Sequence, residues 1–332
     1  MPESRRRVAI LGLLLVLVAC SESGPRLVHL EGHAQGTSYR VSVVVLPGHD
    51  SAALHRALER ELVAIDRLYS NWREDSAVER FNAYAGSEPF EVGSDFVGLI
   101  EKALGVHRAS AGCFDPTVGP LMRAWGLRAG APRIPSADER TQLRASTGLD
   151  RLQIVDATHI AKQTPAVQLD LAGIAQGDSL ARLADIVEAD GISAYMIELG
   201  GEIVVRGARP DGPWRIAVFD PGPEATAPAE VIEHDSDQRL AIATSGTYQH
   251  VVELDGRRYS HILDPRSARP VEHDTVSVTV LDDDPALADA WSTALLCLGQ
   301  TSGSELADKH AIAALFVQRD GHRSTTRRWS GR

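Results

Sequence analysis

The sequence predicts an α+β domain built around a mixed sheet. Segments with the alternating pattern of strands and segments with the spacing of helices follow one another without a strict strand–helix–strand order. Several strand candidates are separated only by short turns, as in hairpins, which argues against a doubly wound fold. The 332 residues, 43% hydrophobic and 24% charged, suit one large globular domain or two medium ones.

Residues 1–19 resemble a lipoprotein signal peptide. Three arginines at positions 5–7 precede an apolar run over 8–19 that is too short to span a bilayer as a stable helix. Cys20 directly follows Ala19, as in a bacterial lipobox, so we expect cleavage before Cys20 and a lipid on it. This predicts a membrane-anchored lipoprotein that faces the periplasm, with the inner membrane as first choice. A plain secretory signal with a chance cysteine is the alternative.

The charge balance excludes a general attraction for nucleic acid. The chain has 34 Lys and Arg against 45 Asp and Glu, a formal net charge of −11. Any bound phosphate must therefore be met locally by a cation, a metal or backbone N–H groups. Beyond Cys20 only Cys113 and Cys297 remain, and the sequence does not show whether they are close. We expect two free, mostly buried thiols.

Helical spacing occurs in four segments, and the last three are followed by a glycine. We expect helices over 51–69, 96–111, 177–190 and 286–298. A further short helix is expected after Asp75 or Ser76, either of which could cap it.

Strand candidates occupy most of the remaining chain. The stretch 128–145, rich in Arg, Pro and Ala, predicts a surface excursion. We expect residues 20–28 to be a tether, residues 29–320 to be the domain, and the polar, basic residues 321–332 to be a frayed tail. The strands are expected over 41–46, 152–155, 167–171, 195–199, 203–205, 214–219, 240–244, 249–254, 275–281 and 311–317.

Five polar segments lie where strand and helix candidates meet. Taken singly, each has an ordinary explanation, because glycines permit tight turns and Asp-Pro pairs mark turns. Asp289 and Thr293 are four residues apart and share one helical face, where such a pair can merely cap or solvate the helix. The segments are 35–39, 70–82, 114–121, 169–177 and 257–270, the last together with 244–246 and 288–294.

Together these segments resemble the ApbE family, the FAD:protein FMN transferases. Seven motifs carry the resemblance, in order, over about residues 33–317. They are FDPTVGPL, LDLAGIAQG, LGGEIVVRG, ATSGTYQH, YSHILDPRSARPV, SVTV and ADAWSTALLCLG. The resemblance implies the T-fold-related domain of that family. It also implies Mg²⁺-dependent transfer of FMN from FAD to a threonine of a target protein, with release of AMP.

Phosphoryl transfer needs positioning and neutralisation of pyrophosphate charge, which a hard cation on oxygen ligands supplies. The resemblance implies that Asp289, Thr293 and the backbone carbonyl of Gly173 hold Mg²⁺. It assigns His261 to the acceptor threonine, whose proton an ordinary histidine can take near neutral pH. A histidine bonded to a backbone carbonyl is the structural alternative. Asp264-Pro265 would fix the turn, and Arg266 would meet phosphate or the target peptide.

The resemblance also implies a set of FAD contacts. Trp72 would stack on a ring, with core packing as the alternative for Trp72 and Phe114. Asp170 would accept hydrogen bonds from the adenosine part. Gln176 stands where the family usually has lysine, and Gln35 where methionine is commoner, which puts FAD affinity in doubt more than reaction type. The expected set is Gln35, Trp72, Cys113, Phe114, Asp115, Asp170, Gln176 and Ile262.

Two other functions fit the same residues. A Mg²⁺-dependent FAD pyrophosphatase would use water as the acceptor and give FMN and AMP. A periplasmic FAD-binding or flavin-delivery lipoprotein with little turnover belongs to another class, and the neutral Gln176 keeps it open. The sequence names no target protein, but the resemblance implies a flavin subunit of a periplasmic or membrane redox complex.

Overall fold

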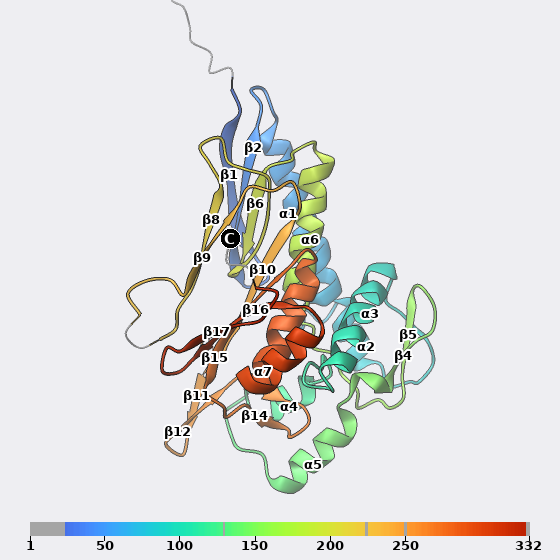
Figure 1. The fold of residues 1–332 in the computed structure, drawn as a ribbon. Helices are drawn as coiled ribbons and strands as arrows, with labels where there is room; N and C mark the ends of the chain where they lie inside the picture. The colour runs from blue at the N-terminus through green and yellow to red at the C-terminus, as the bar shows by residue number, and fades with distance from the viewer. Residues whose placement is uncertain (1–23, 129, 223–224, 249–250, 330–332) are drawn as a thin grey trace, which may run out of the picture.

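An eight-stranded sheet forms the frame of the molecule, seen in the computed structural model that describes residues 24–128, 130–222, 225–248 and 251–329 (Figure 1). This confirms the α+β class. Every neighbouring pair in the sheet is antiparallel, where the sequence predicted a mixed sheet. In spatial order the strands are β1 (Arg26–Ala34), β2 (Thr37–Val45), β6 (Tyr195–Leu199), β7 (Glu202–Arg206), β10 (Leu240–Gly246), β15 (Thr275–Asp282), β16 (Ala313–Gln318) and β17 (Arg323–Thr325).

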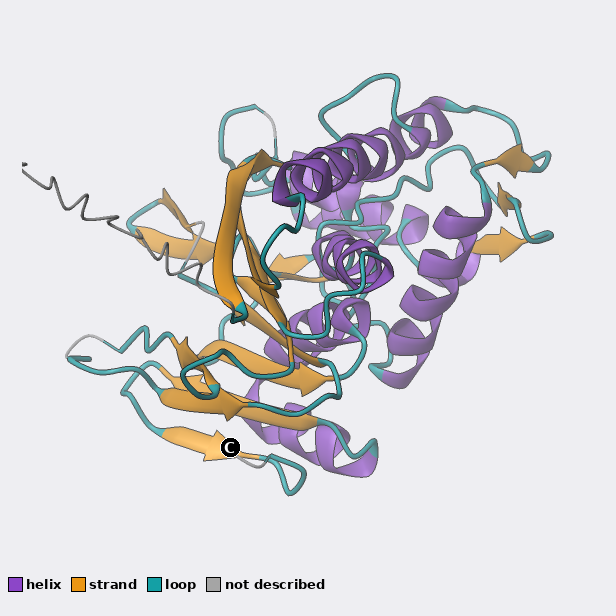
Figure 2. Ribbon diagram, turned by 90° about the horizontal axis from the view of Figure 1, so that it is seen from above, coloured by secondary structure: helices purple, strands orange, loops and turns teal. Residues whose placement is uncertain are grey.

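Helices cover one face of this sheet (Figure 2). Apolar residues of α1 (Ser51–Tyr69) and α6 (Ala175–Ala189) pack on β1, β2 and β6. A second cluster joins α2 (Ala77–Ala83), α3 (Ser94–Ala109) and α7 (Pro285–Lys309) to β10, β15 and β16. The two halves of the sheet therefore carry separate hydrophobic cores, and α6 and α7 lie side by side where the cores meet.

Smaller elements surround this frame. The hairpin of β8 (Trp214–Val218) and β9 (Glu230–His234) contributes to an apolar cluster with residues of β7, β10, β15 and β16. The connection from α3 to α6 holds α4 (Gly119–Ala124), α5 (Ala137–Ser146), the turn η1 (Leu149–Arg151), β4 (Leu152–Ile154) and β5 (His159–Lys162). In a small three-stranded sheet, β5 pairs with β4 and with β3 (Phe90–Glu91), which comes just before α3. Between β10 and β15 come the two-stranded pairs β11 (Val251–Leu254) with β12 (Arg257–Ser260) and β13 (Leu263–Asp264) with β14 (Arg269–Pro270).

The predicted helices are confirmed, with α1 at its expected bounds. Ser76, rather than Asp75, caps α2, because its hydroxyl accepts from the N–H of Glu79. The predicted break at Gly299 is confirmed: the helical conformation is interrupted there, and a second helical segment follows. Only Gly299 leaves the helical conformation, at φ 72°, and the helix resumes as far as Lys309. A glycine adopts this conformation with positive φ without the steric cost that a side chain would add, so the chain can turn here between the two helical segments.

The predicted strand over 167–171 is wrong. Its backbone pairs with loops and side chains: Leu169 exchanges hydrogen bonds with the side-chain amide of Asn82, and the N–H of Asp170 donates to the carbonyl of Pro116. An extended segment of this kind has the apolar pattern of a strand but no strand partner. The predicted surface excursion over 128–145 contains most of α5, a helix without buried residues.

Both ends of the described chain differ from the predicted tether and tail. β1 begins at Arg26, within the expected tether, and pairs with β2 along its whole length. The expected frayed tail contains β17, which pairs with β16, and Thr326 beyond it is buried. Cys20 and the predicted signal peptide lie outside the described residues. None of the helices in the described part of the chain is both long and apolar enough to cross a membrane.

Candidate functional site

Two adjoining cavities bring the candidate residues together. One, of about 440 Å³, is lined by eleven of the twelve and is called here the Asp289 cavity. The other, of about 840 Å³, is lined by the twelfth, Gln35, and is called the Gln35 cavity. They share four lining residues. The eleven are Trp72, Cys113, Phe114, Asp115, Asp170, Gly173, Gln176, His261, Ile262, Asp289 and Thr293, and the shared residues are Trp72, Arg128, Ala172 and Gln176.

The first turns of α7 position Asp289 and Thr293. Asp284 caps the helix. Asp289 and Thr293 are four residues apart, so both side chains lie on one face of it, which meets β10 and the start of α6. Oδ2 of Asp289 accepts from the N–H of Gly177 at 3.0 Å. Oγ1 of Thr293 lies 3.1 Å from Oγ of Ser245, on β10.

Gly173 lies against Thr293, in the turn before α6. A Cβ added to Gly173 would lie 3.2 Å from Oγ1 of Thr293 and 3.4 Å from the ring of Phe114. The close approach explains why the position suits a glycine, and it places the backbone of this turn beside the hydroxyl. The three residues expected to bind the metal are thus neighbours although they come from segments more than 100 residues apart.

Two carboxylates face the Asp289 cavity without a cationic partner. Asp289 is only 5% exposed, and burial raises its pKa to about 7. Glu202, at the start of β7, lines the same cavity, and its Oε2 is buried without a hydrogen-bond partner. Burial, followed by the nearby charge of Asp289, raises the pKa of Glu202 well above its ordinary value. Neither forms an ion pair within the described ranges, so a bound cation would relieve both.

The loop at 113–118 holds its own aspartate. Asp115 is buried, and its Oδ1 accepts from the N–H of Thr117 at 2.8 Å and from its hydroxyl at 2.6 Å. Burial raises the pKa of Asp115 in spite of these bonds. Nδ1 of His107 lies 2.9 Å from the carbonyl oxygen of Phe114. The loop therefore keeps its shape through local bonds and presents residues 113–116 to the cavity.

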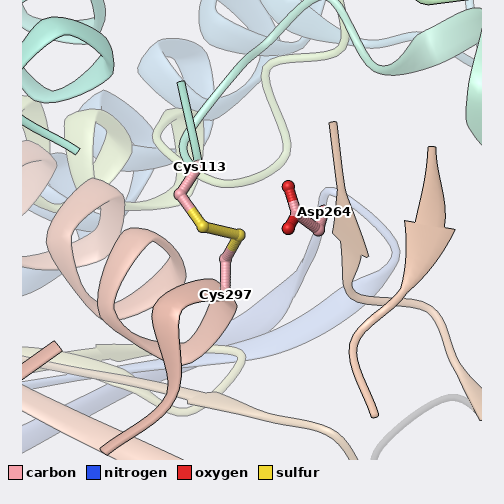
Figure 3. Close-up of side chains that lie close together, drawn as sticks. All are labelled: Cys113, Asp264 and Cys297. Atoms are coloured by element: carbon pink, nitrogen blue, oxygen red, sulfur yellow. A yellow bond between two sulfur atoms is a disulfide. The ribbon is translucent and has the colours of Figure 1, made fainter. Parts of the chain in front are cut away.

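A disulfide joins Cys113 to Cys297, so the prediction of two free thiols is wrong (Figure 3). Their Cα atoms are 5.8 Å apart although 184 residues separate them in sequence. The bridge ties the 113–118 loop to α7, four residues after Thr293. Figure 3 shows the carboxylate of Asp264 beside the bridge. Cys113, Asp264 and Cys297 lie close enough to share a metal ion, but cysteine binds a metal as a thiolate. Because both sulfurs are in a disulfide, this group does not form a metal site.

Arg128, Asp170 and Trp72 form a cluster where the two cavities meet. Nη2 of Arg128 donates to Oδ1 of the buried Asp170 at 2.9 Å and lies 2.8 Å from Oδ2. Its guanidinium carbon lies 5.7 Å from the centre of the Trp72 ring. Trp72 is 77% exposed, which excludes the alternative of core packing for it. Phe114 is 3% exposed and packs in the core while also lining the cavity.

The two glutamines that depart from the family pattern are both engaged. Nε2 of Gln176 donates to the carbonyl of Leu199 at 3.0 Å, over the turn between β6 and β7. Nε2 of Gln35 donates to the hydroxyl of Ser179, in α6, at 2.7 Å. Gln176 therefore does not point to solvent, but its amide donor is already used by the protein.

His261 lies between β12 and β13 and lines the same cavity as Asp289. The N–H of Ile262 donates to the hydroxyl of Ser260, which closes a tight turn around the histidine. Arg266 donates to both oxygens of Asp264, at 2.9 Å each, so the arginine expected to meet phosphate or peptide is paired within its own turn.

Sequence reasoning gave no role to three residues of this site, although it placed Ser245 in the polar segment 244–246. Glu202 and Ser245 lie inside quoted motifs, LGGEIVVRG and ATSGTYQH, so the motifs held a signal for them. Arg128 begins the stretch interpreted as a surface excursion, and no local pattern separates it from the other arginines there.

The similarity to known proteins covers nearly the whole chain. A model of the ApbE family matches residues 35–316. The chain belongs to the ApbE family. The FAD:protein FMN transferase of Vibrio cholerae serotype O1 is 37% identical over 317 residues, 94% of this chain and 93% of that protein. The FAD:protein FMN transferase of Escherichia coli K12 is 33% identical over 97% of this chain and 94% of its own length.

Solved structures of ApbE proteins share the fold. The flavin transferase ApbE from Vibrio cholerae has a TM-score of 0.84 at 36% identity, over 92% of this chain and 98% of that chain. The apo form of the Pseudomonas stutzeri flavinyl transferase ApbE has a TM-score of 0.83 at 36% identity, over 92% and 96% of the two chains. The α+β architecture described above is therefore the ApbE architecture.

Proposed function

We propose that this chain is a FAD:protein FMN transferase that moves FMN from FAD to a threonine of a target protein, with Mg²⁺ and with release of AMP. The observation that carries the proposal is the convergence of Asp289, Thr293, Gly173 and His261 in one cavity with the residues expected to bind FAD. The names of the similar proteins from Vibrio cholerae and Escherichia coli support the class of reaction.

The residues present fit a divalent cation. The orphaned Oε2 of Glu202 and the buried carboxylate of Asp289 both favour a positive charge in the Asp289 cavity. Asp289, the hydroxyl of Thr293 and the backbone carbonyl of Gly173 would hold Mg²⁺, all through oxygen atoms, as this hard cation prefers. When bound, the ion would neutralise charge on the pyrophosphate of FAD.

The two cavities fit the two ends of a dinucleotide. Gln35 and the exposed Trp72 line the larger one, where the flat flavin ring would find an aromatic surface and an amide. The 113–115 loop, Asp170 and Ile262 line the smaller one, where the adenosine part would lie. The pyrophosphate would then lie between them, next to the residues that both cavities share.

His261 would take the proton from the hydroxyl of the acceptor threonine. The freed oxygen attacks the phosphorus on the FMN side of the pyrophosphate, a new P–O bond forms, and the bond to the bridging oxygen breaks. The electron pair of that bond leaves with AMP, and the threonine keeps FMN as a phosphoester. Asp264 and Arg266 fix the turn that follows the histidine.

We propose a periplasm-facing membrane location for this activity, with a redox-complex subunit as the target. The disulfide between Cys113 and Cys297 supports the compartment, because such bridges persist in oxidising surroundings and are rare in the cytosol.

The test measures AMP, free FMN and protein-bound flavin after incubation with FAD and Mg²⁺, with and without an acceptor protein. The transferase predicts AMP and bound flavin that both depend on the acceptor. Acceptor-independent AMP with equal free FMN would identify a pyrophosphatase, and FAD binding without AMP would identify a binding protein. The variant His261→Ala should bind FAD within a few-fold of wild type but transfer FMN about 10² to 10⁴ times more slowly. Lost FAD affinity with an unchanged transfer step would assign His261 to binding instead.

A further inference from the structure

We propose that Arg128 binds the pyrophosphate of FAD, and that Asp170 holds its guanidinium in place until the dinucleotide arrives. This inference rests on the proposed function and adds a specificity-determining residue to it. It distinguishes flavins that carry phosphate from those that carry none.

Arg128 has the position that the role requires. Among the described residues, it is the only cationic side chain that lines both cavities. A ligand that extends from one cavity into the other must pass the residues they share. A dinucleotide has its negative charge in the middle, between its two ring systems, so the charge would meet the guanidinium there.

The geometry of the guanidinium suits an exchange of partners. One nitrogen of Arg128, Nη2, donates to Oδ1 of Asp170 at 2.9 Å and lies 2.8 Å from Oδ2. Carboxylate and phosphate present the same fork of oxygens to an arginine, which therefore binds both in the same manner. After the exchange Asp170 would still accept from the N–H of Ala172, which lies 3.2 Å from Oδ1.

Within the described ranges, no other cationic side chain lines the junction of the two cavities: Arg123 lies near Asp170 but lines neither cavity. The amide nitrogen of Gln176, the other long polar side chain shared by the cavities, already donates to Leu199. Arg73 lines only the Gln35 cavity and pairs with Asp75 at 2.8 Å. Arg128 also lies over the Trp72 ring, so stacking holds its side chain near the flavin even when Asp170 is released.

The experiment compares FAD with riboflavin, which has the same ring and no phosphate, by flavin fluorescence titration of the full enzyme. Arg128→Gln should weaken FAD binding at least about tenfold, the loss expected for a charge-assisted hydrogen-bonded pair, and leave riboflavin binding within about twofold. Arg128→Lys keeps the charge without the fork and should lose about threefold for FAD alone. Raising the salt concentration should weaken FAD binding to the wild type more than to Arg128→Gln.

Arg133→Gln is the matched control, since it removes an arginine that pairs with Glu139 and lines neither cavity, and it should bind both flavins as the wild type does. Thermal unfolding checks that Arg128→Gln folds, and Arg128→Lys carries the test if it does not. Equal losses for FAD and riboflavin would show that Arg128 acts only by supporting Trp72, and unchanged FAD affinity would exclude any role. A wild type that does not bind FAD would instead overturn the proposed function and this inference with it.

Discussion

The two sides of the site are built in different ways. On one side, Asp289 and Thr293 stand on α7, a helix packed against β10 and β15 in the larger apolar core. On the other side, Trp72, Arg128 and the 113–118 loop lie on connections between elements. These connections are held by the disulfide, by the Arg128–Asp170 ion pair and by side chains bonded to backbone groups.

The difference separates two tasks. Groups that bind a metal must keep a fixed geometry, which a buried helix face provides through packing alone. A dinucleotide is long and must enter and leave, so its contacts come from loops, whose positions depend on a few specific bonds. We therefore expect changes on the α7 side to abolish chemistry, and changes on the loop side to alter FAD affinity and stability by smaller amounts.

Loss of Asp289 should have the largest effect. Asp289→Ala removes the only carboxylate of the proposed ligand set, so Mg²⁺-dependent AMP release should fall by at least about 10³-fold while the protein stays folded. Asp283→Ala is the matched control, because Asp283 is exposed just before α7 and does not line the cavity. AMP release at the wild-type rate with unchanged Mg²⁺ dependence would show that the metal assignment is wrong.

Breaking the disulfide tests how much the loop side depends on one covalent bond. Replacing Cys113 and Cys297 by serine should lower the free energy of unfolding by about 2–4 kcal/mol, because the bridge closes a long loop in the unfolded chain. FAD affinity should fall more than Mg²⁺ affinity, since Cys113 borders the loop and α7 is held by its core. Denaturant unfolding measures the first effect, and calorimetric titration the second. A reductant should reproduce both in the wild type and change nothing in the double variant.

Elements of the fold were predictable where burial of one face makes apolar residues recur at regular intervals along the sequence. The helix over 51–69 was placed at its true bounds because its leucines repeat on one face. The segment 167–171 was misplaced because an apolar, extended stretch looks the same whether a strand or the side chain of Asn82 completes its hydrogen bonds.

The sequence motifs predicted most residues of the site, but not the contacts between residues far apart in the chain. The two cysteines lie 184 residues apart, and only folding brings them together. The Arg128–Asp170 pair is equally invisible, because a sequence shows charges without showing which of them meet. The sequence held only a hint of the bridge: an export signal, one cysteine directly before the motif FDPTVGPL and another inside ADAWSTALLCLG.

In protein freed of metal with a chelator, the free energy of unfolding should depend on pH through Asp289, on the α7 side of the site. Burial raises the pKa of Asp289 to about 7, so between about pH 4 and pH 7 the folded state holds a proton that the unfolded chain has released. This contribution to stability is therefore lost as the pH rises through that window, by at most about 1.4 kcal/mol per pH unit. In Asp289→Asn it should be absent, and Mg²⁺ should offset it in the wild type. Parallel unfolding profiles of the two proteins from pH 5 to 8 would contradict this.

The smallest expected effect is on Gln176. Replacing its amide by an ammonium in Gln176→Lys would exchange the bond to Leu199 for a charge near the phosphates, at a gain of roughly 1 kcal/mol. FAD binding should tighten several-fold, and more at low salt than at high salt. Gln176→Glu, of similar length and opposite charge, should weaken it. Equal affinities for all three proteins at both salt concentrations would mean that this position does not face the phosphates.

The most direct test of the account is the mass of an acceptor protein after incubation with the enzyme, FAD and Mg²⁺. We predict an added mass equal to FMN less one water, located by fragmentation on a threonine, formed in step with AMP and absent when the enzyme carries Asp289→Ala. AMP and free FMN in equal amounts, with an unmodified acceptor, would contradict the transfer of FMN to protein.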